Sequence, residues 1–248
     1  MPAVVVLPTY NEIENLEPLL RQVLAVAPDV CVLVVDDASP DGTGELADRL
    51  AGELGRVEVL HRPLKEGLGS AYRAGFAHAL ARGAESLVSM DADFSHDPSA
   101  LPGLLAAVGG DGVDMVIGSR YVPGGAVVDW PRRRRMLSKW GNRYTAWILG
   151  LPVADCTSGY RAYRADAVRA IDHADTTAEG YAFLTELVRR MTDAGRTIAE
   201  VPITFVDRQR GRSKMSWRIV LESMVLVTRW GVADRRRRRV LDRQRGRA

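Results

Sequence analysis

The chain is organised around residues 87–98, which read LVSMDADFSHDP. This stretch runs from apolar residues into Asp91 and Asp93, two carboxylates spaced i, i+2, and closes on a polar turn with Pro98. Successive side chains of an extended chain alternate faces, so the two carboxylates point the same way. Mg²⁺ takes oxygen ligands, often one or two carboxylates together with substrate phosphates. The spacing therefore predicts a site for a metal-bound diphosphate, and the alternative is a solvated turn, in which Asp and Pro are ordinary residues.

Short apolar runs alternate with helical patterns around this stretch. The apolar runs predict strands at residues 3–7, 30–35, 57–60, 86–90 and 114–117. Apolar residues at helical spacing predict helices at residues 13–24, 46–54 and 98–108, and a Gly-rich turn at residues 67–70 leads into a further helix that runs to about residue 80. Strands that alternate with helices of about ten to fifteen residues indicate βαβ units. The first half of the chain is therefore predicted to be an α/β domain with a mostly parallel sheet flanked by helices.

Polar clusters follow the predicted strands at residues 9–12, 36–37, 91–93 and 118–120. Open α/β sheets bind ligands outside the carboxyl ends of their strands. The four clusters therefore predict a nucleotide-binding edge. A dinucleotide fingerprint at Gly67-Leu68-Gly69 is disfavoured because Tyr72 occupies the position of its third glycine, and these glycines are instead typical of a turn that starts a helix.

The second half of the chain is less regular. In order, it reads as an arginine-rich loop at 120–135, a helix at 136–149, a polar turn at 155–161, a helix that opens at 181–186, a strand at 198–206, a cationic loop at 207–214 and an apolar helix at 219–230.

Composition describes an ordinary soluble globular chain, with 46% hydrophobic residues and two cysteines that offer no disulfide framework. We expect no signal peptide, and no apolar run reaches the roughly 18 residues of a membrane-spanning helix. The net charge of +3 hides an asymmetry: residues 207–248 hold fourteen Lys/Arg against four Asp/Glu, a local balance of +10 that leaves −7 for the first 206 residues. A basic tail on an acidic body predicts an anionic partner for the tail.

The motifs taken together resemble the family 2 glycosyltransferases of the GT-A fold, and among these the polyprenol-phosphate (dolichol-phosphate) mannose synthases that lack transmembrane helices. The matching segments lie in consistent order between residues 4 and 232 and read LPTYNEIENL, VVDDASPDGT, GLGSAYRAGF, MDADFSHDP, GSRY, TSGYRAYR, GYAFLTEL and FVDRQRGRSKMS. The resemblance implies a GT-A catalytic domain over residues 1–232 that ends in an amphipathic helix. We expect residues 233–248 to form a basic, disordered tail.

The same resemblance implies the reaction and its site. Its substrates would be GDP-mannose and a polyprenyl monophosphate, its metal Mg²⁺ or Mn²⁺, and its product a β-linked mannosyl lipid. The residues implied to hold the nucleotide are Pro8, Tyr10, Glu12, Asp36 and Asp37. Those implied to hold the metal and diphosphate are Asp91 and Asp93, with Ser95 at a position where some relatives carry a glutamine ligand. The basic residues implied to hold phosphates, and with Asp93 to form the catalytic set, are Arg120, Arg134, Arg208 and Lys214.

The chemistry of such a reaction needs no general base. An acceptor phosphate has already lost its first proton at neutral pH, and its second pKa is about 6. The four histidines are not expected to cluster with the motifs. The main requirement is to neutralise charge, because an anionic nucleophile approaches a diphosphate. Glu186 is a candidate for a contact with a sugar hydroxyl, and the alternative is a solvated acid on a helix.

Several alternatives stay open from the sequence. The same machinery serves UDP-glucose or UDP-N-acetylhexosamine, and a nucleotide-sugar-binding accessory subunit without catalysis is a further hypothesis. We expect peripheral attachment to the cytoplasmic face of a membrane, through an anionic lipid surface that attracts the tail, with a membrane-anchoring partner protein as an additional candidate. Binding of RNA by the basic tail is a third hypothesis, but nucleic acid is not an expected partner, because no aromatic residues are interleaved with the tail arginines.

Overall fold

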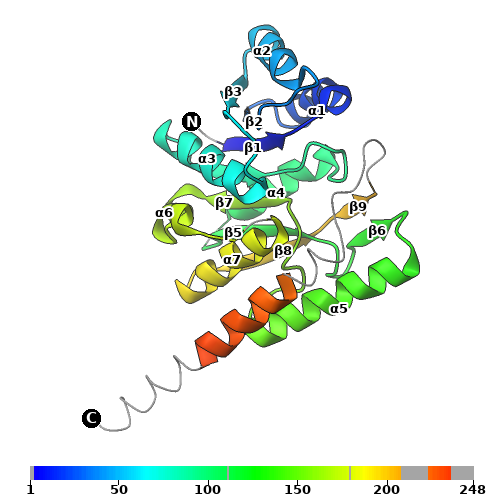
Figure 1. The fold of residues 1–248 in the computed structure, drawn as a ribbon, viewed down its shortest axis with the longest axis vertical. Coiled ribbons are helices and arrows are strands. Elements are labelled where there is room, and N and C mark those ends of the chain that lie inside the picture. The colour runs from blue at the N-terminus through cyan, green and yellow to red at the C-terminus, as the bar shows by residue number, and fades with distance from the viewer. Residues whose placement is uncertain (1–2, 111, 179, 208–222, 236–248) are drawn as a thin grey trace.

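A seven-stranded sheet forms the centre of the computed structural model (Figure 1), which describes residues 3–110, 112–178, 180–207 and 223–235. The strands lie in the order β3-β2-β1-β4-β7-β5-β8. Their bounds are β1 Ala3–Thr9, β2 Cys31–Asp36, β3 Val57–His61, β4 Ser86–Ser89, β5 Met115–Ser119, β7 Arg161–Arg164 and β8 Ile198–Pro202. All neighbouring strands are parallel except β7, which is antiparallel to both β4 and β5. The expected mostly parallel α/β fold is confirmed.

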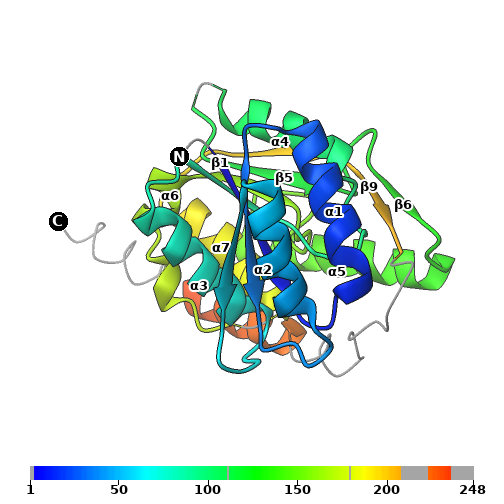
Figure 2. The same cartoon turned by 90° about the horizontal axis from the view of Figure 1, so that it is seen from above.

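Helices cover both faces of this sheet and enclose two hydrophobic clusters. The helices are α1 Ile13–Val26, α2 Thr43–Leu54, α3 Leu68–Ala81, α4 Leu101–Val108, α5 Arg132–Leu149, α6 Ala165–Ala170 and α7 Gly180–Asp193, with short 3₁₀ turns at Pro98–Ala100 and His173–Asp175. The side chains of β1 alternate between the clusters: Val5 packs with α1, α2 and α4, and Val6 packs with α3 and α7. Figure 2 shows α1 and α2 side by side on their face.

The helix α3 approaches the sheet closely because Gly75 has no side chain. A Cβ atom added there would lie 2.4 Å from Val6 Cγ1 and 3.0 Å from Val35 Cγ2. The turn before this helix uses Gly67 at a φ of 106°, in agreement with the turn predicted from the sequence. The glycines of this segment therefore serve backbone geometry and packing.

The second half differs from its sequence-based prediction in three places. The predicted arginine-rich loop contains β6 (Ala126–Val128), and α5 starts at Arg132, so the four arginines form the first turn of that helix. The predicted polar turn leads into β7, which fills the gap between β4 and β5. The strand predicted at 198–206 is two strands, β8 and β9 (Thr204–Val206), because Pro202 has no N–H to continue the ladder. The second of them, β9, pairs with β6 in a separate two-stranded sheet.

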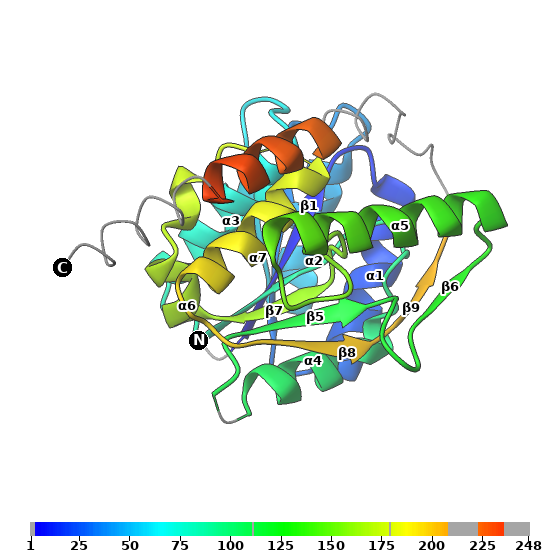
Figure 3. The same cartoon turned by 90° about the horizontal axis from the view of Figure 1, so that it is seen from below.

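Residues 223–235 form a helix that lies beside α5 (Figures 1 and 3). Tyr144 Oη and Thr228 Oγ1 are 2.8 Å apart, and Gly231 allows close contact, since a Cβ there would lie 2.7 Å from Ile148 Cγ1. Residues 233–235 of the predicted tail belong to this helix, and the rest of the tail lies outside the described residues. In the part of the chain that the structure describes, none of the helices is both long and apolar enough to cross a membrane.

Candidate active site

The carboxyl ends of β2, β1 and β4 lie next to one another, because these strands are adjacent and parallel. They carry the predicted nucleotide pair Asp36–Asp37, the predicted residues that follow β1, and the predicted metal ligands. The carboxyl end of β5, which precedes the fourth cluster, lies at the same edge, because β7 is antiparallel to both β4 and β5. The topology therefore brings all four polar clusters to one edge of the sheet, as the sequence predicts.

The pair Asp36–Asp37 is tied into the protein. Asp36 accepts hydrogen bonds from Thr9 Oγ1 at 2.9 Å and from Ser39 Oγ at 2.6 Å. Asp37 accepts a hydrogen bond from Arg62 Nη1 at 2.6 Å, and both members of that ion pair are buried. Burial raises the pKa of Asp37 above its ordinary value, and this effect outweighs the lowering by Arg62. This carboxylate is held in a place where a further donor would stabilise its charge.

The other predicted nucleotide residues surround the end of β1. Pro8 lies within β1, opposite Val35 of β2. The ammonium of Lys65 lies 3.7 Å from the centroid of the Tyr10 ring, and Glu12 Oε2 accepts a hydrogen bond from Asn15 at 2.8 Å. None of these residues lines the cavity described next.

A cavity of about 180 Å³ lies between the end of β4, the helix α5 and the helix of residues 223–235. Five predicted site residues line it, namely Asp91, Asp93, Ser95, Arg120 and Arg134. Its remaining wall is largely apolar and aromatic, with Trp130, Leu137, Trp140, Phe205, Met224 and Val227 among its members. The cavity thus joins the predicted metal ligands and two of the predicted phosphate ligands to a surface suited to hydrocarbon.

The residues at the end of β4 fit a hard divalent ion. Asp93 is buried and accepts a hydrogen bond from Ser95 N at 3.0 Å, and Tyr72 Oη donates to Asp91 Oδ1 at 3.3 Å. Ser95 Oγ is buried and has no hydrogen-bond partner among the described residues. A Cβ at Gly159 would approach Asp91 Oδ2 to 3.2 Å, so glycine leaves space beside that carboxylate.

Oxygen atoms of this kind are the ligands that Mg²⁺ and Mn²⁺ accept in proteins. Within the described residues no three or more His, Cys, Asp or Glu side chains gather to hold an ion. A metal here would therefore take two carboxylates, and at most the serine hydroxyl, from these residues, and substrate oxygens suit the remaining positions.

His96 corrects the expectation that no histidine clusters with the motifs. Its side chain is fully buried, lines the cavity, and accepts a hydrogen bond at Nδ1 from Asp91 N at 3.2 Å. The imidazole stacks on Tyr160 with 5.1 Å between ring centroids and meets the edge of Phe205 at 5.6 Å. Burial lowers its pKa, which keeps the ring neutral and Nδ1 available as an acceptor. His96 therefore fixes the backbone of the first aspartate of the motif.

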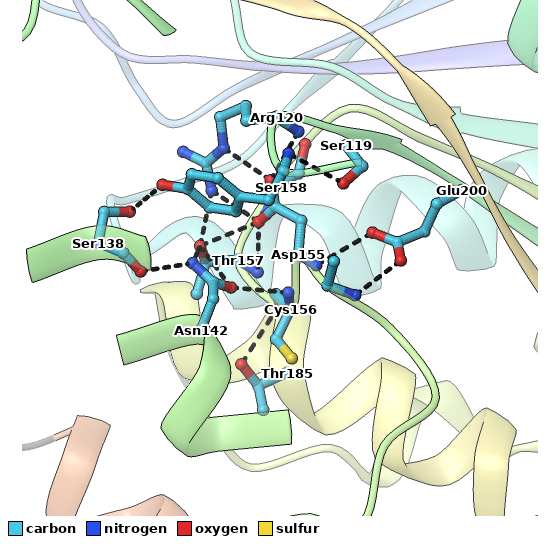
Figure 4. A network of polar contacts seen from close by, with 12 residues as sticks. Ser119, Arg120, Ser138, Asn142, Asp155, Cys156, Thr157, Ser158, Thr185 and Glu200 are labelled. Atoms are coloured by element: carbon cyan, nitrogen blue, oxygen red, sulfur yellow. Dashed lines mark hydrogen bonds and ion pairs between the residues drawn. The ribbon is translucent and has the colours of Figure 1, made fainter. Parts of the chain in front are cut away.

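Arg120 is held by a bidentate ion pair with Asp155 (Figure 4). Arg120 Nε and Nη2 each lie 2.7 Å from an oxygen of Asp155, and Nη2 also donates to Thr157 Oγ1 at 2.7 Å. Burial alone would raise the pKa of Asp155, but the charge and hydrogen bonds of Arg120 bring it below its ordinary value. Glu200 and Asn142 hold the same loop by accepting hydrogen bonds from Ala154 N, Asp155 N and Cys156 N. This network orients the guanidinium at the cavity wall.

Residues 4–172 match the family model described as Glycosyl transferase family 2. The chain belongs to glycosyl transferase family 2. It is 53% identical to the undecaprenyl-phosphate mannosyltransferase of Micrococcus luteus over 235 residues, which are 95% of this chain and 96% of that protein. It is 50% identical to the polyprenol monophosphomannose synthase of Mycolicibacterium smegmatis over 243 residues, 98% of this chain and 89% of that protein.

Solved structures with the same fold include the glucosyl-3-phosphoglycerate synthase of Mycobacterium tuberculosis in complex with UDP. It superimposes with a TM-score of 0.64 at 20% identity and covers 92% of this chain and 80% of its own. The complex of that synthase with Mn²⁺, UDP-glucose and phosphoglyceric acid gives a TM-score of 0.65, also at 20% identity. That match covers 92% of this chain and 79% of the synthase chain. The likeness establishes the fold, and the GT-A-like architecture predicted for this family 2 glycosyltransferase is confirmed.

The remaining predicted residues of this glycosyltransferase fall into three groups. Among the four arginines that start α5, Arg134 lines the cavity, where it pairs with Asp207 at 2.9 Å and lies 3.9 Å from the centroid of the Trp130 ring. Arg208 and Lys214 lie outside the described residues. Glu186 is buried rather than solvated, accepts hydrogen bonds from Thr177 N and Ala178 N, and pairs with Arg190.

Sequence reasoning assigned no role to three residues that shape this site in the glycosyltransferase. His96 stands inside the quoted motif, so its place next to Asp91 offered a signal that was available. Asp155 belongs to a segment noted only as polar, and nothing in the sequence links it to Arg120, 35 positions away. Trp130 stacks under Arg134 and carries a buried indole N–H without a hydrogen-bond partner among the described residues, and no sequence pattern marks it.

Proposed function

We propose that this glycosyltransferase transfers mannose from GDP-mannose to a polyprenyl monophosphate with inversion, giving a β-linked polyprenyl-phosphate mannose. The observation that carries the proposal is the cavity, in which carboxylates and arginines at one end adjoin an apolar wall. A lipid monophosphate has the matching chemistry, with an anionic head and a hydrocarbon chain. The two named relatives, similar over nearly their whole length, support this acceptor and this sugar.

The residues of the cavity suit a transfer in which the acceptor phosphate itself attacks the sugar carbon. No base is needed to deprotonate this nucleophile. Arg134 and Arg120 reduce the repulsion between the incoming phosphate and the departing diphosphate, and guanidinium groups suit this task because they bind phosphate oxygens in pairs. Arg208 and Lys214 would complete this cationic wall, as their motif predicts.

The carboxylates at the end of β4 have a separate task. Asp91 and Asp93, with Ser95, would hold Mg²⁺ or Mn²⁺, which when bound supplies a Lewis acid for the charge of the leaving diphosphate. His96 keeps the backbone of Asp91 in place, and Asp93 is fixed by its own hydrogen bond from Ser95 N. Preorganised groups of this kind need no rearrangement as charge develops in the transition state.

The donor nucleoside fits the neighbouring edge of the sheet. Asp36, Asp37 and the residues around Tyr10 lie at the ends of the strands next to β4, so a nucleoside there leaves its diphosphate near Asp91. Asp37 is suited to accept hydrogen bonds from a base, because its charge is only partly compensated. We propose attachment to the cytoplasmic face of the membrane, where a lipid acceptor and a soluble nucleotide sugar meet.

The first experiment measures transfer of radiolabelled sugar to a polyprenyl phosphate in detergent, from GDP-mannose and separately from UDP-glucose or UDP-N-acetylglucosamine, with and without Mg²⁺ or Mn²⁺. We expect metal-dependent mannosyl lipid. Transfer from a UDP-sugar alone would mean that the donor is not GDP-mannose, while polyprenyl phosphate would remain the acceptor. If the protein bound GDP but transferred sugar from none of these donors, the result would favour a nucleotide-sugar-binding accessory subunit over an enzyme.

The matched variants are Asp93→Asn at the site and Asp29→Asn in an exposed turn after α1. Loss of one preorganised electrostatic contact lowers turnover by about 100- to 1000-fold. The turnover of Asp93→Asn should therefore fall by that factor, and the turnover of Asp29→Asn should equal that of the wild type. Equal rates for both variants would remove Asp93 from the mechanism.

A further inference from the structure

The outward face of α5 carries large apolar side chains in solvent. Met136, Trp140 and Trp147 are exposed over 72%, 57% and 68% of their surface. Their spacing of four and seven residues puts them on one stripe of the helix. Trp side chains in water are costly unless something covers them, and the ends of their rings suit a boundary between hydrocarbon and water.

The same face is strongly cationic. The sequence of α5, RRRRMLSKWGNRYTAWIL, holds six Lys/Arg and no Asp or Glu. Arg143 lies within the apolar stripe, and Arg132, Arg133 and Lys139 lie along its sides, all four exposed. An amphipathic helix with tryptophans on its apolar stripe and cations along it is typical of a helix that lies in the plane of a membrane surface.

The neighbouring helix of residues 223–235 extends this face (Figure 3). Val225 and Val232 are exposed over 45% and 42% of their surface, and Arg229 is exposed as well. The guanidinium of Arg235 lies 5.2 Å from the centroid of the Trp147 ring, so the two helices share one aromatic and cationic surface. We call the exposed residues Met136, Trp140, Arg143, Trp147, Val225, Val232 and the flanking cations the α5 platform.

We infer that the α5 platform docks on an anionic lipid bilayer, with α5 lying along the surface. Leu137 and Trp140 are both exposed and line the cavity, so the mouth of the cavity lies at the platform. The phosphate of a lipid could then reach Arg134 while the hydrocarbon chain of that lipid stays in the bilayer. The inference deepens the proposed function, and it places membrane attachment on the folded domain, apart from the basic residues 236–248.

Charge decides among the occupants of this face. A second copy of the chain would bring two cationic platforms together, which repel. A single-stranded nucleic acid would match the cations and stack on tryptophans, but it would leave the exposed Met136 and Val225 in water. Anionic lipid satisfies both the cations and the aliphatic side chains.

The test measures binding of the full chain to vesicles of phosphatidylcholine with and without phosphatidylglycerol, by sedimentation at several salt concentrations. Wild-type protein should prefer the anionic vesicles, and the preference should weaken with salt. In the variant Arg132→Gln/Arg133→Gln/Arg143→Gln the affinity should drop about fivefold for each arginine. In Met136→Ser/Trp147→Ser it should fall by at least about tenfold.

Matched controls come from α1, α2 and the turn after α2, at the opposite end of the molecule (Figure 1). Val26→Ser removes an exposed apolar side chain from α1, and Arg49→Gln/Arg56→Gln removes two exposed cations. These controls should bind vesicles as the wild type does. Quenching of tryptophan fluorescence by brominated lipid adds a direct probe, because Trp147→Phe should remove a large part of the quenching.

The outcomes separate this inference from the proposed function. Platform variants with unchanged urea midpoints and unchanged transfer to a short, water-soluble acceptor, but weak vesicle binding, support it. Vesicle binding that survives in both platform variants and disappears on deletion of residues 236–248 would overturn it. So would preferential binding to single-stranded RNA, or self-association that Met136→Ser/Trp147→Ser abolishes. Vesicle binding by the platform without any sugar transfer would refute the proposed function alone.

Discussion

Two buried Arg–Asp pairs lie at different strand ends of this protein, and their carboxylates behave in opposite ways. Arg62 pairs with Asp37 after β2, and Arg120 pairs with Asp155 beside the cavity. All four side chains are less than a tenth exposed. The pKa of Asp37 is nevertheless raised, and that of Asp155 is lowered. The same two residue types therefore do not make the same kind of site.

The difference lies in the number of donors that reach each carboxylate. Asp155 accepts hydrogen bonds from Arg120 Nε, Nη2 and backbone N, and from Ser158 N at 3.1 Å. Asp37 has Arg62 Nη1 and the backbone of Glu66, and the neighbouring Asp36 adds like charge. At Asp37 the effect of burial on the pKa exceeds that of the donors, and at Asp155 the donors exceed the effect of burial. We interpret Asp155 as a structural anchor that positions Arg120, and Asp37 as a group poised for a donor from a ligand.

Asp155→Asn should have the largest effect on stability. The change leaves the buried Arg120 without its counter-charge, and breaking a buried pair on one side costs about 3–5 kcal/mol of unfolding free energy. Urea unfolding of both proteins at pH 7 measures this loss. A cost below about 1 kcal/mol would mean that Arg120 finds another partner and that Asp155 is not an anchor.

The double variant Arg120→Met/Asp155→Leu separates stability from function at this pair. Apolar residues of similar volume often replace a buried ion pair without loss of stability, so much of the unfolding free energy should return. Sugar transfer should stay low if Arg120 contacts a phosphate. Full recovery of transfer would make the arginine purely structural.

Asp37→Asn should affect the ligand more than the fold. Arg62 keeps its ion pair with Glu66 after this change, and the ionised form of Asp37 is itself disfavoured by burial, so the neutral replacement should change the unfolding free energy by less than about 1 kcal/mol. A hydrogen bond to a charged group contributes about 1.5–3 kcal/mol, so GDP affinity should fall by about 10- to 100-fold in calorimetry. Asp48→Asn, an exposed acid on α2, is the control. Unchanged GDP affinity would contradict the assignment.

The contrast between the two pairs also shows which parts of the fold and of the site can be predicted from the sequence. The alternating pattern of the first half places Asp37, Asp91 and Asp93 at strand ends, because apolar periodicity and parallel topology determine where strands stop. The pairing of Arg120 with Asp155 depends on β7 entering the sheet antiparallel between β4 and β5. That insertion rests on long-range packing around a four-residue strand, which leaves no local pattern to read.

The two Arg–Asp pairs should also differ in how their contribution to stability changes at acid pH. The folded pKa of Asp155 lies below its unfolded value of about 3.9, so its stabilising contribution is present above that pH and is lost as pH falls toward the folded pKa. Asp37 has a raised folded pKa, so its contribution to stability grows as pH falls. Urea unfolding between pH 5 and pH 3 should therefore show a shallower loss for Asp155→Asn than for the wild type, by at most about 1.4 kcal/mol per pH unit. Asp37→Asn should show a steeper loss, and identical slopes would refute the assigned pKa directions.

The smallest expected effects concern the hydroxyl that assists each arginine. Arg120 Nη2 donates to Thr157 Oγ1, and Arg62 Nη2 donates to Ser70 Oγ, both at 2.7 Å. Thr157→Val leaves a donor inside a buried network and should cost about 1–2 kcal/mol, whereas Ser70→Ala lies at a wetter position where water replaces the hydroxyl, and should cost about 0.5 kcal/mol. If Ser70→Ala proved the more damaging in urea unfolding, the pair with Asp37 would be the better anchored of the two. The distinction between an anchoring carboxylate and a ligand-binding one would then have to be reversed.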